Sequence, residues 1–513
     1  MTTAAIQIHP SDTVAVALAD LQAGAEIRIG HDCIIVRDPV PAGHKIACIG
    51  HAAGSQLIKY GCPIGHATKP IAAGEWVHSH NLATDLAGVI DYEYAPQEPA
   101  ITHQPGAATF SGYLRDDGTA GVRNELWVIP TVGCVNGVAR ALAQAGPRID
   151  GIDGVHAFTH PHGCSQLGDD HRATQRILAG LVRHPNAAGV LVVGLGCENN
   201  NIAEFRSIMD AETRAEHVRT RRPPVRPYGR DDDRRVRFLA CQDAADEYAA
   251  GAAMLRDLAE YARRFTRTQV PLSLLKVGVK CGGSDAFSGI TANPVVGAVA
   301  DRIVAGGGTV IMTEVPEMFG AEHLLLNRCA TREVFSDAVA MINGFKRFFE
   351  RCGQPIYENP SPGNRAGGIT TLEEKSLGCT QKAGFGSVQA VLEYGGRAAV
   401  SGLNLLSGPG NDIISTTALA AAGAQVVLFT TGRGTPLGGP VPTIKIASTS
   451  ALAARKPGWI DFDAGRLLDG AATDALADGL LAQLLSVASG DAITRNERNG
   501  CREIAIFKDG VTL

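Results

Sequence analysis

The feature that most constrains the fold of this chain is a set of apolar segments that are the length of strands and end at glycine. The clearest is the near-continuous run AGVLVVGLG at residues 188–196. An uninterrupted apolar run bounded by turn residues is typical of a strand buried on both faces, as in parallel sheets. Segments with helical spacing lie between such runs, so the sequence predicts α/β architecture with largely parallel sheets.

Two regions show this alternation. The first has expected strands at 124–130, 155–160 and 188–196 and expected helices at 137–145, 170–184 and 243–265. The second has expected strands at 274–283, 307–314 and 424–436 and an expected helix at 293–306. Residues 1–92 instead carry short β-type runs with frequent glycine and proline, which predicts a small all-β module.

Only Thr13–Leu21 in this module has helical spacing, and it follows the capping candidates Ser11 and Asp12. The proline-rich stretch 93–112 reads as a linker. We therefore expect a multidomain chain with a β module at 1–92, a linker at 93–112, an α/β domain at 113–268 and a C-terminal α/β domain at 269–513.

The bulk composition excludes several classes of function. The net charge of the 513 residues is only −5, which does not favour a nucleic-acid partner. No apolar stretch reaches the roughly 18 residues of a membrane helix, and the N-terminus lacks the features of a signal peptide. We therefore expect a cytoplasmic protein whose twelve cysteines are mostly thiols. The oligomeric state is left open, a homo-oligomer included.

Four cysteines follow expected strands: Cys134 in TVGCVNG, Cys164 in HGCSQ, Cys197 in GLGCEN and Cys281 in KCGGSD. In open α/β sheets, ligands bind outside the carboxyl ends of the strands. Converging thiolates would favour iron or an iron–sulfur cluster over magnesium. The alternative is that each cysteine is a small buried hydrophobe.

Histidines supply further candidates. His78 and His80 lie two residues apart, so on a strand both rings would project from one face. His44 and Lys45 stand together on another short segment, and His160 lies close to Cys164 in the sequence. The alternative interpretation is that these side chains are simply solvated.

Two polar loops follow strands in the last region. Glu314 and Glu317 follow one strand, and TTGRGTP places Thr431 and Arg433 among glycines after another. Hydroxyl, backbone N–H and guanidinium groups suit a carboxylate or sugar hydroxyls. Neither a dinucleotide-binding fingerprint nor a phosphate-binding P-loop is present in the sequence.

Several longer segments resemble the altronate and galactarate dehydratase family. They are TVGCVNG, HGCSQLGDDH, GLGCEN, KCGGSDAFSGITANP, TEVPEMFGAEHLL, TTLEEKSLGCTQK and FTTGRGTP. The resemblance extends from about Ile6 to Leu513 and includes an N-terminal module similar to a SAF, or β-clip, domain. Within the family, WVHSHN, HGCSQLGDDH and VPEMFGAEHLL are most similar to the altronate branch.

The resemblance implies dehydration of D-altronate to 2-dehydro-3-deoxy-D-gluconate, with iron(II) that manganese(II) partly replaces. This reaction needs a base at C2, an acid at the C3 hydroxyl and a group that stabilises the enolate. We predict metal ligation by Cys164, Cys197, Cys281 and His160. We predict acid–base roles for His78, His80 and Lys45 and substrate binding by His44, Asn81, Thr431 and Arg433.

Three alternatives stay open. The substrate could be galactarate or another sugar acid of the same family. An oxygen-sensitive iron–sulfur cluster could replace a single iron ion. The chain could also be a non-catalytic sugar-acid binding protein whose cysteines are structural.

Overall fold

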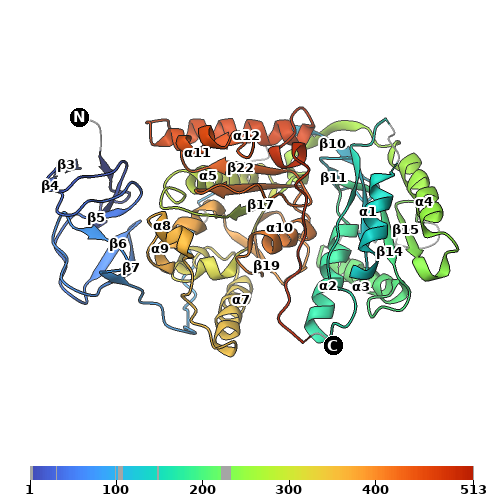
Figure 1. Ribbon diagram of the computed structural model, residues 1–513, viewed down its shortest axis with the longest axis horizontal. Coiled ribbons are helices and arrows are strands. Elements are labelled where there is room, and N and C mark those ends of the chain that lie inside the picture. The colour runs from blue at the N-terminus through green and yellow to red at the C-terminus, as the bar shows by residue number, and fades with distance from the viewer. Residues whose placement is uncertain are drawn as a thin grey trace.

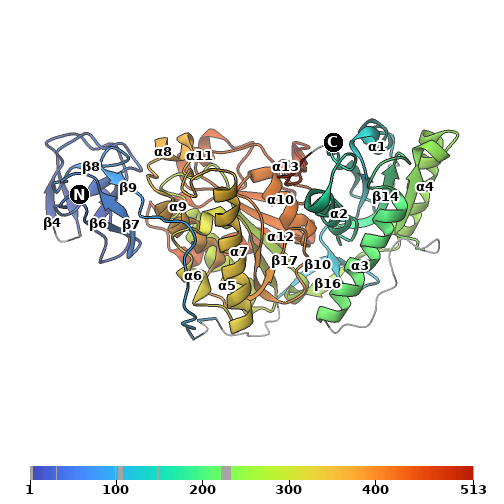
Figure 2. The ribbon, with the colours of Figure 1, turned by 90° about the horizontal axis from the view of Figure 1, so that it is seen from below.

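The computed structural model describes residues 4–30, 32–98, 100–101, 108–146, 150–220 and 233–511. Within these ranges the chain forms three units, and the predicted fold class is confirmed. The N-terminal β module and the second α/β unit lie on opposite sides of the C-terminal unit (Figures 1 and 2). Part of the predicted linker, residues 99 and 102–107, lies outside the described ranges. Among the described helices, none is both long and apolar enough to cross a membrane.

The N-terminal module is built from short antiparallel strands. One sheet has the order β1-β2-β5-β8, a second is the β3-β4 hairpin and a third has the order β6-β7-β9. The strands are β1 (Ala5–Ile6), β2 (Val14–Ala17), β3 (Glu26–Ile29), β4 (Asp32–Ile35), β5 (Lys45–Ala47), β6 (Gln56–Lys59), β7 (Cys62–Ala67), β8 (Trp76–Val77) and β9 (Leu82–Ala83).

The helix expected at Thr13–Leu21 is wrong, because this segment contains strand β2. All four residues of β2 are buried and the strand pairs with β1 and β5, so sheet pairing overrides the weak helical spacing. Asp12 does not cap a helix. Its carboxylate accepts hydrogen bonds from the backbone N–H groups of His9 and Gly61, which fixes the turn before β2.

The second unit is a four-stranded parallel sheet with the order β13-β12-β14-β15. Its strands are β12 (Glu125–Pro130), β13 (Gly154–Ala157), β14 (Ala187–Gly194) and β15 (Val236–Ala240). Its helices are α1 (Asn136–Gln144), α2 (Gly168–Val182), α3 (Ile202–Thr220) and α4 (Glu247–Ala262). Every residue of β14 is buried, which is the property that its apolar sequence predicts.

A small antiparallel sheet joins the two α/β units. Its order is β11-β10-β16, formed by β10 (Thr109–Leu114), β11 (Ala120–Gly121) and β16 (Arg267–Pro271). Strand β10, which precedes the second unit in the sequence, therefore pairs with β16, which follows it.

The C-terminal unit is a seven-stranded sheet with the order β19-β20-β18-β17-β21-β22-β23, in which all the pairs are parallel. Its strands are β17 (Lys276–Cys281), β18 (Thr309–Met312), β19 (Val388–Leu392), β20 (Gly402–Leu406), β21 (Val426–Thr431), β22 (Thr443–Ala447) and β23 (Phe462–Asp463). Its helices are α5 (Ala292–Ala305), α6 (His323–Leu326), α7 (Arg332–Arg351), α8 (Pro362–Ala366), α9 (Leu372–Cys379), α10 (Asp412–Ala421), α11 (Ser450–Arg455), α12 (Thr473–Ser489) and α13 (Arg495–Arg498).

Candidate active site

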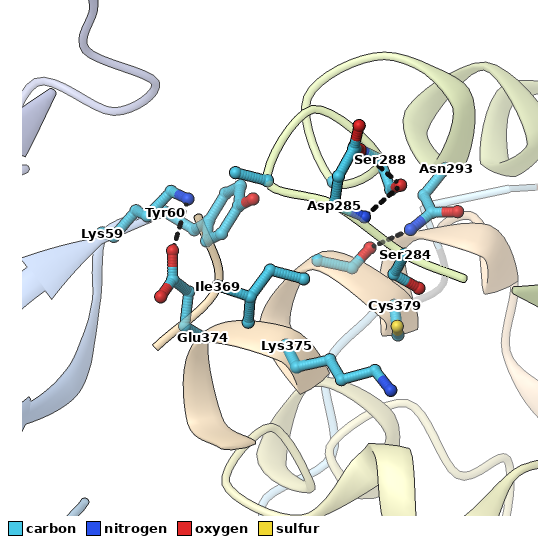
Figure 3. A pocket seen from close by; sticks show the side chains of 13 residues that line it. Lys59, Tyr60, Ser284, Asp285, Ser288, Asn293, Ile369, Glu374, Lys375 and Cys379 are labelled. Carbon is cyan, nitrogen blue, oxygen red and sulfur yellow. Dashed lines mark hydrogen bonds and ion pairs between the residues drawn. The ribbon is translucent and has the colours of Figure 1, made fainter. Parts of the chain in front are cut away.

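A pocket lies between the N-terminal module and the carboxyl edge of the seven-stranded sheet (Figure 3). It encloses about 230 Å³ of empty space, counting the part that is open to solvent. Its lining combines residues around β6 with the loop after β17 and helix α9: Lys59, Tyr60, Ser284, Asp285, Ala286, Ser288, Gly289, Asn293, Ile369, Glu374, Lys375, Gly378 and Cys379. This is the edge at which open parallel sheets bind their ligands.

Two lysines of the N-terminal module converge on one carboxylate of α9. The ammonium of Lys45 lies 2.7 Å from Oε2 of Glu374, and that of Lys59 lies 2.8 Å from Oε1. All three side chains are almost completely buried. Burial alone would raise the pKa of Glu374, but the two ammonium groups lower it to about 2. The carboxylate is therefore charged at neutral pH and holds the module against α9.

Lys45 differs from the predicted free acid–base group. Its ammonium also donates hydrogen bonds to the hydroxyl of Thr370 (2.7 Å) and the carbonyl of Gly368 (2.8 Å). With the bond to Glu374, all three ammonium protons have acceptors. Burial lowers the pKa of Lys45 to about 8. In this arrangement Lys45 is a link between domains, and it could accept a proton only after losing one of its own.

His44 and His78 also contact the C-terminal unit. Nε2 of His78 lies 3.0 Å from the carbonyl oxygen of Arg365, and Nε2 of His44 lies 3.4 Å from that of Ala366. Burial, followed by the charge of Lys45, lowers the pKa of His78 to about 4, so its ring is neutral at pH 7. Both rings contact the backbone beside the pocket, and neither is among the residues that line it.

The remaining candidates in the module lie around Trp76. The exposed ring of His80 packs on the indole, with centroids 5.0 Å apart. Asn81 is buried in its own turn, where its amide accepts from the N–H of His78 and donates to the carbonyl of Trp76, each at 2.9 Å. This use of both ends of the amide gives Asn81 a structural role, in contrast to the predicted substrate contact.

Asp285 places a second carboxyl group on the pocket wall, besides that of Glu374 (Figure 3). It accepts hydrogen bonds from the backbone N–H and hydroxyl of Ser288, both at 2.9 Å, and from the hydroxyl of Ser448 at 3.1 Å. Burial nevertheless raises the pKa of Asp285. A Cβ on Gly432 would collide with this carboxylate, so the TTGRG loop needs glycine there to approach it.

A layer of buried ion pairs lies below the pocket. Lys375 pairs with Glu317 at 2.8 Å, and Lys382 pairs with Glu314 at 3.0 Å. Lys280 shares the carboxylate of Glu314. Glu314 has a φ of 71°, which is a rare conformation for a residue with a side chain. Strained residues of this kind concentrate at functional sites, where the surrounding contacts hold them in place.

Two thiols join this layer. Sγ of Cys281 lies 2.6 Å from the hydroxyl of Ser284, and Cys379 donates to Glu317 at 3.1 Å. The neighbouring thiol of Cys379 and the ammonium of Lys382 lower the pKa of the Cys281 thiol. Cys281 is buried at the end of β17 in the C-terminal unit.

The predicted carboxylate-binding loop borders this site. The backbone N–H of Arg433 donates to the carbonyl of Gly283 at 2.9 Å, and Gly283 directly precedes the lining residue Ser284. The side chain of Arg433 is exposed. The hydroxyl of Thr431 is buried and accepts the N–H of Gly434 at 2.9 Å. Arg433 is therefore available to a ligand, whereas Thr431 shapes the loop.

The other predicted metal ligands lie in the second unit. Cys164 and Cys197 are exposed in loops that follow β13 and β14. His160 is buried: Nε2 contacts the carbonyl of Pro130 at 2.8 Å and Nδ1 accepts the N–H of His162 at 3.2 Å. Both ring nitrogens are thus engaged. A single ion shared by these residues and Cys281 does not fit this geometry, because Cys281 belongs to a different sheet.

Sequence reasoning missed most of the residues that line the pocket. Lys59, Tyr60, Asp285, Glu374 and Lys375 carry no spacing signal of their own. A charged segment such as LEEKSLGC normally reads as an exposed helix, yet every residue of α9 is buried. The available signal was the occurrence of Asp285, Glu374 and Lys375 inside the long segments that carry the family resemblance.

Comparison with known proteins decides the family. Three family models match in order: "Altronate/galactarate dehydratase SAF domain" at residues 3–85, "D-galactarate dehydratase/Altronate hydrolase, second domain" at 112–263 and "D-galactarate/Altronate dehydratase, C-terminal" at 272–512. The altronate dehydratase of Escherichia coli (strain K12) is 51% identical over 512 residues, covering 99% of each chain. The chain belongs to the altronate/galactarate dehydratase family.

Other members of this family match over similar lengths. The altronate dehydratase of Bacillus subtilis (strain 168) is 48% identical over 514 residues and 99% of each chain. The galactarate dehydratase (L-threo-forming) of Escherichia coli (strain K12) is 32% identical over 528 residues, covering 98% of this chain and 96% of its own. The N-terminal β module is therefore the SAF domain of this family, and the pocket lies between it and the family's C-terminal domain.

Proposed function

We propose that this chain is a hydro-lyase that converts D-altronate to 2-dehydro-3-deoxy-D-gluconate. The observation that carries the proposal is the sequence identity of 51% and 48% to two altronate dehydratases over 99% of each chain. The identity to the galactarate-acting relative is lower, at 32%. Sequence similarity of this extent covers all three domains, including both walls of the pocket.

The pocket between the SAF and C-terminal domains supports the chemistry of this reaction. The substrate carboxylate would pair with the exposed guanidinium of Arg433 at the border of the pocket. A buried carboxyl with a raised pKa is protonated more readily than a carboxyl in water, which suits donation to a leaving hydroxyl. Asp285 has this environment, so we propose that it donates the proton to the leaving C3 hydroxyl.

The base that removes the C2 proton remains a prediction from the sequence. His78 and His80 are its candidates, because neutral imidazole accepts a proton. We also propose iron(II), replaced in part by manganese(II), on the basis of the family resemblance. When bound, the metal would act as a Lewis acid that stabilises the negative charge formed next to the carboxylate. Among the described residues, no three His, Cys, Asp or Glu side chains are gathered closely enough for one ion.

We further propose a cytoplasmic location, because all twelve cysteines are free thiols, as a reducing compartment favours. The function itself is tested with the full-length protein, purified anaerobically and supplied with iron(II). Incubation with D-altronate should give a 2-keto-3-deoxy acid, detected by the periodate–thiobarbiturate reaction. Absence of this product from folded, iron-supplied protein would refute the proposal.

A further inference from the structure

Three exposed cysteines lie together at one edge of the second domain. Cys134 follows β12, Cys164 follows β13 and Cys197 follows β14, and these three strands are neighbours in one parallel sheet. The carboxyl ends of neighbouring parallel strands meet at one edge. Cysteine is among the most frequently buried residue types, so three exposed thiols at one sheet edge are not explained by packing.

Backbone hydrogen bonds tie the three cysteine loops to one another. The N–H of Gly133 donates to the carbonyl of His162 at 2.8 Å, which joins the loops of Cys134 and Cys164. The N–H of Asn200 donates to the carbonyl of Gly163 at 3.0 Å, which joins the loops of Cys164 and Cys197. Each of these bonds forms within three residues of a cysteine. The spacing of the three thiols is therefore fixed by the fold.

The buried carboxylate of Glu198 fixes the third loop. It accepts the backbone N–H groups of the consecutive residues Leu195 (3.0 Å) and Gly196 (2.6 Å), just before Cys197. It also accepts the hydroxyl of Thr131, at 2.7 Å, from the segment that leads to Cys134. Glu198 is thus a positioning residue that orients the loop of Cys197 toward the loop of Cys134.

Unpaired polar atoms occur in the segments that follow the same three strands. Gln166 Nε2 and Asn200 Oδ1 are buried without a hydrogen-bond partner, and these residues are 2% and 0% exposed. Asn136 Oδ1 and His171 Nε2 are also buried without a partner. Buried polar side-chain atoms are normally paired, so unpaired atoms in the segments that carry the three cysteines are consistent with a bound group at this edge.

We propose that Cys134, Cys164 and Cys197 bind an iron–sulfur cluster of the [4Fe–4S] type. Thiolate is a soft ligand that selects iron–sulfur clusters, zinc or copper(I) over magnesium and calcium. Each of the three cysteines follows a different strand, and no single-ion site of three His, Cys, Asp or Glu side chains is found among the described residues. A cluster is a larger body, and its cysteine ligands lie correspondingly farther apart.

Three protein ligands leave one iron of such a cluster without a cysteine. The fourth strand of the sheet, β15, is followed by Cys241, but this side chain is only partly exposed and packs against the apolar cluster that contains Leu239 and Leu255. It therefore faces the interior and is not counted as a ligand. The open iron would accept an oxygen donor from water or from a small acid. Binding of the cluster converts the three thiols to thiolates and releases their protons.

This site is distinct from the pocket proposed for the reaction. The second domain and the SAF domain lie on opposite sides of the C-terminal domain (Figures 1 and 2). Cys281, which belongs to the layer below the pocket, is not part of the cluster site. The inference therefore does not depend on altronate being the substrate.

The test measures iron and acid-labile sulfide in the full-length protein after anaerobic reconstitution with iron(III), sulfide and a thiol reductant, which together supply the mixed iron(II) and iron(III) state of the cluster. We expect about four iron and about four sulfide per chain, together with the visible absorption of an iron–sulfur cluster. Cys134→Ser, Cys164→Ser and Cys197→Ser should each lower the iron content and the sulfide content by about tenfold or more. Replacing a residue that only supports a metal ligand already lowers metal affinity by about 10- to 100-fold, so replacing the ligand itself should lower it at least as much. Cys241→Ser, on the same sheet, and Cys352→Ser, an exposed cysteine elsewhere, are matched controls that should keep the full cluster.

Thermal melts of each variant show that it is folded, and Cys→Ala variants at the same positions exclude an effect of the serine hydroxyl. A wild-type protein that binds no iron and sulfide together would overturn the inference. Full cluster content in any of the three variants, or its loss in Cys241→Ser, would overturn the ligand set. Turnover of altronate is measured in parallel. An intact cluster without turnover counts against the proposed function alone, and turnover without any cluster counts against the cluster alone.

Discussion

The ammonium of Lys45 lies 2.7 Å from the carboxylate of Glu374, and this contact crosses the boundary between the SAF and C-terminal domains. Lys59 reaches the second oxygen of the same carboxylate at 2.8 Å. One buried carboxylate therefore pairs with two buried ammonium groups, and helix α9 is joined to two strands of the SAF domain. The wall of the pocket depends on this arrangement, because Lys59 and Glu374 both line it.

Glu374→Gln should lower the free energy of unfolding by about 3–5 kcal/mol, because removal of one partner leaves uncompensated buried charges. Denaturant unfolding of the variant and the wild type measures this difference. Limited proteolysis should also show earlier cleavage between the SAF domain and the rest. The control Glu333→Gln, at an exposed position of α7, should change stability by less than about 0.5 kcal/mol. Equal stability of Glu374→Gln and the wild type would contradict this role.

His184 should make stability dependent on pH. Its buried ring contacts the carbonyl of Ala424 at 3.0 Å through Nε2, and burial lowers its pKa from the ordinary 6.5 to about 3. As the pH falls, His184 is therefore protonated at a higher pH in the unfolded chain than in the folded protein. The stability from this group is therefore complete above about pH 6.5 and is lost progressively between pH 6.5 and 3.

The corresponding measurement is urea unfolding at pH 7.5, 5.5 and 4.5. The wild type should lose stability across this series, by an amount on the order of 2–3 kcal/mol from His184 alone. His184→Gln keeps an amide donor for Ala424 but does not titrate, so its stability should fall less steeply. Parallel pH dependence of the two proteins would show that His184 is not the responsible group.

Asp285→Asn should lower kcat by about 10²- to 10⁴-fold, which is the usual contribution of a proton-transferring side chain. The amide is isosteric and can still bond to Ser288 and Ser448, so the melting temperature should change little. Steady-state kinetics on altronate measures the effect, with Asp337→Asn on the exposed face of α7 as a control of unchanged kcat. Wild-type turnover by Asp285→Asn would remove Asp285 from the reaction.

The sequence predicts the architecture well because its signals are local. The run at 188–196 becomes the buried strand β14, and the glycine–cysteine turns lie at strand ends as expected. The helix predicted at Thr13–Leu21 fails because pairing with β1 and β5 decides that segment, and pairing is not visible in local spacing.

The site is harder to predict because it depends on which elements meet. Cys164 and Cys281 carry the same signal, a cysteine after a strand, yet they belong to two different sheets. Lys45 reads as a solvated loop residue, and only the distant Glu374 explains why it is buried. Asp285 is an ordinary acidic residue in the sequence, and its raised pKa arises from packing by the rest of the C-terminal domain.

The most direct test of the account is the ratio of kcat/KM for D-altronate to that for galactarate, measured on the same anaerobic preparation with iron(II). Galactarate carries a second carboxylate where altronate has a terminal CH2OH group, and a site that bonds to that hydroxyl rejects an acid that leaves its polar groups unpaired. We predict turnover of altronate with a kcat/KM about 100-fold or more above that for galactarate. Comparable values for the two acids, or turnover of galactarate alone, would contradict it.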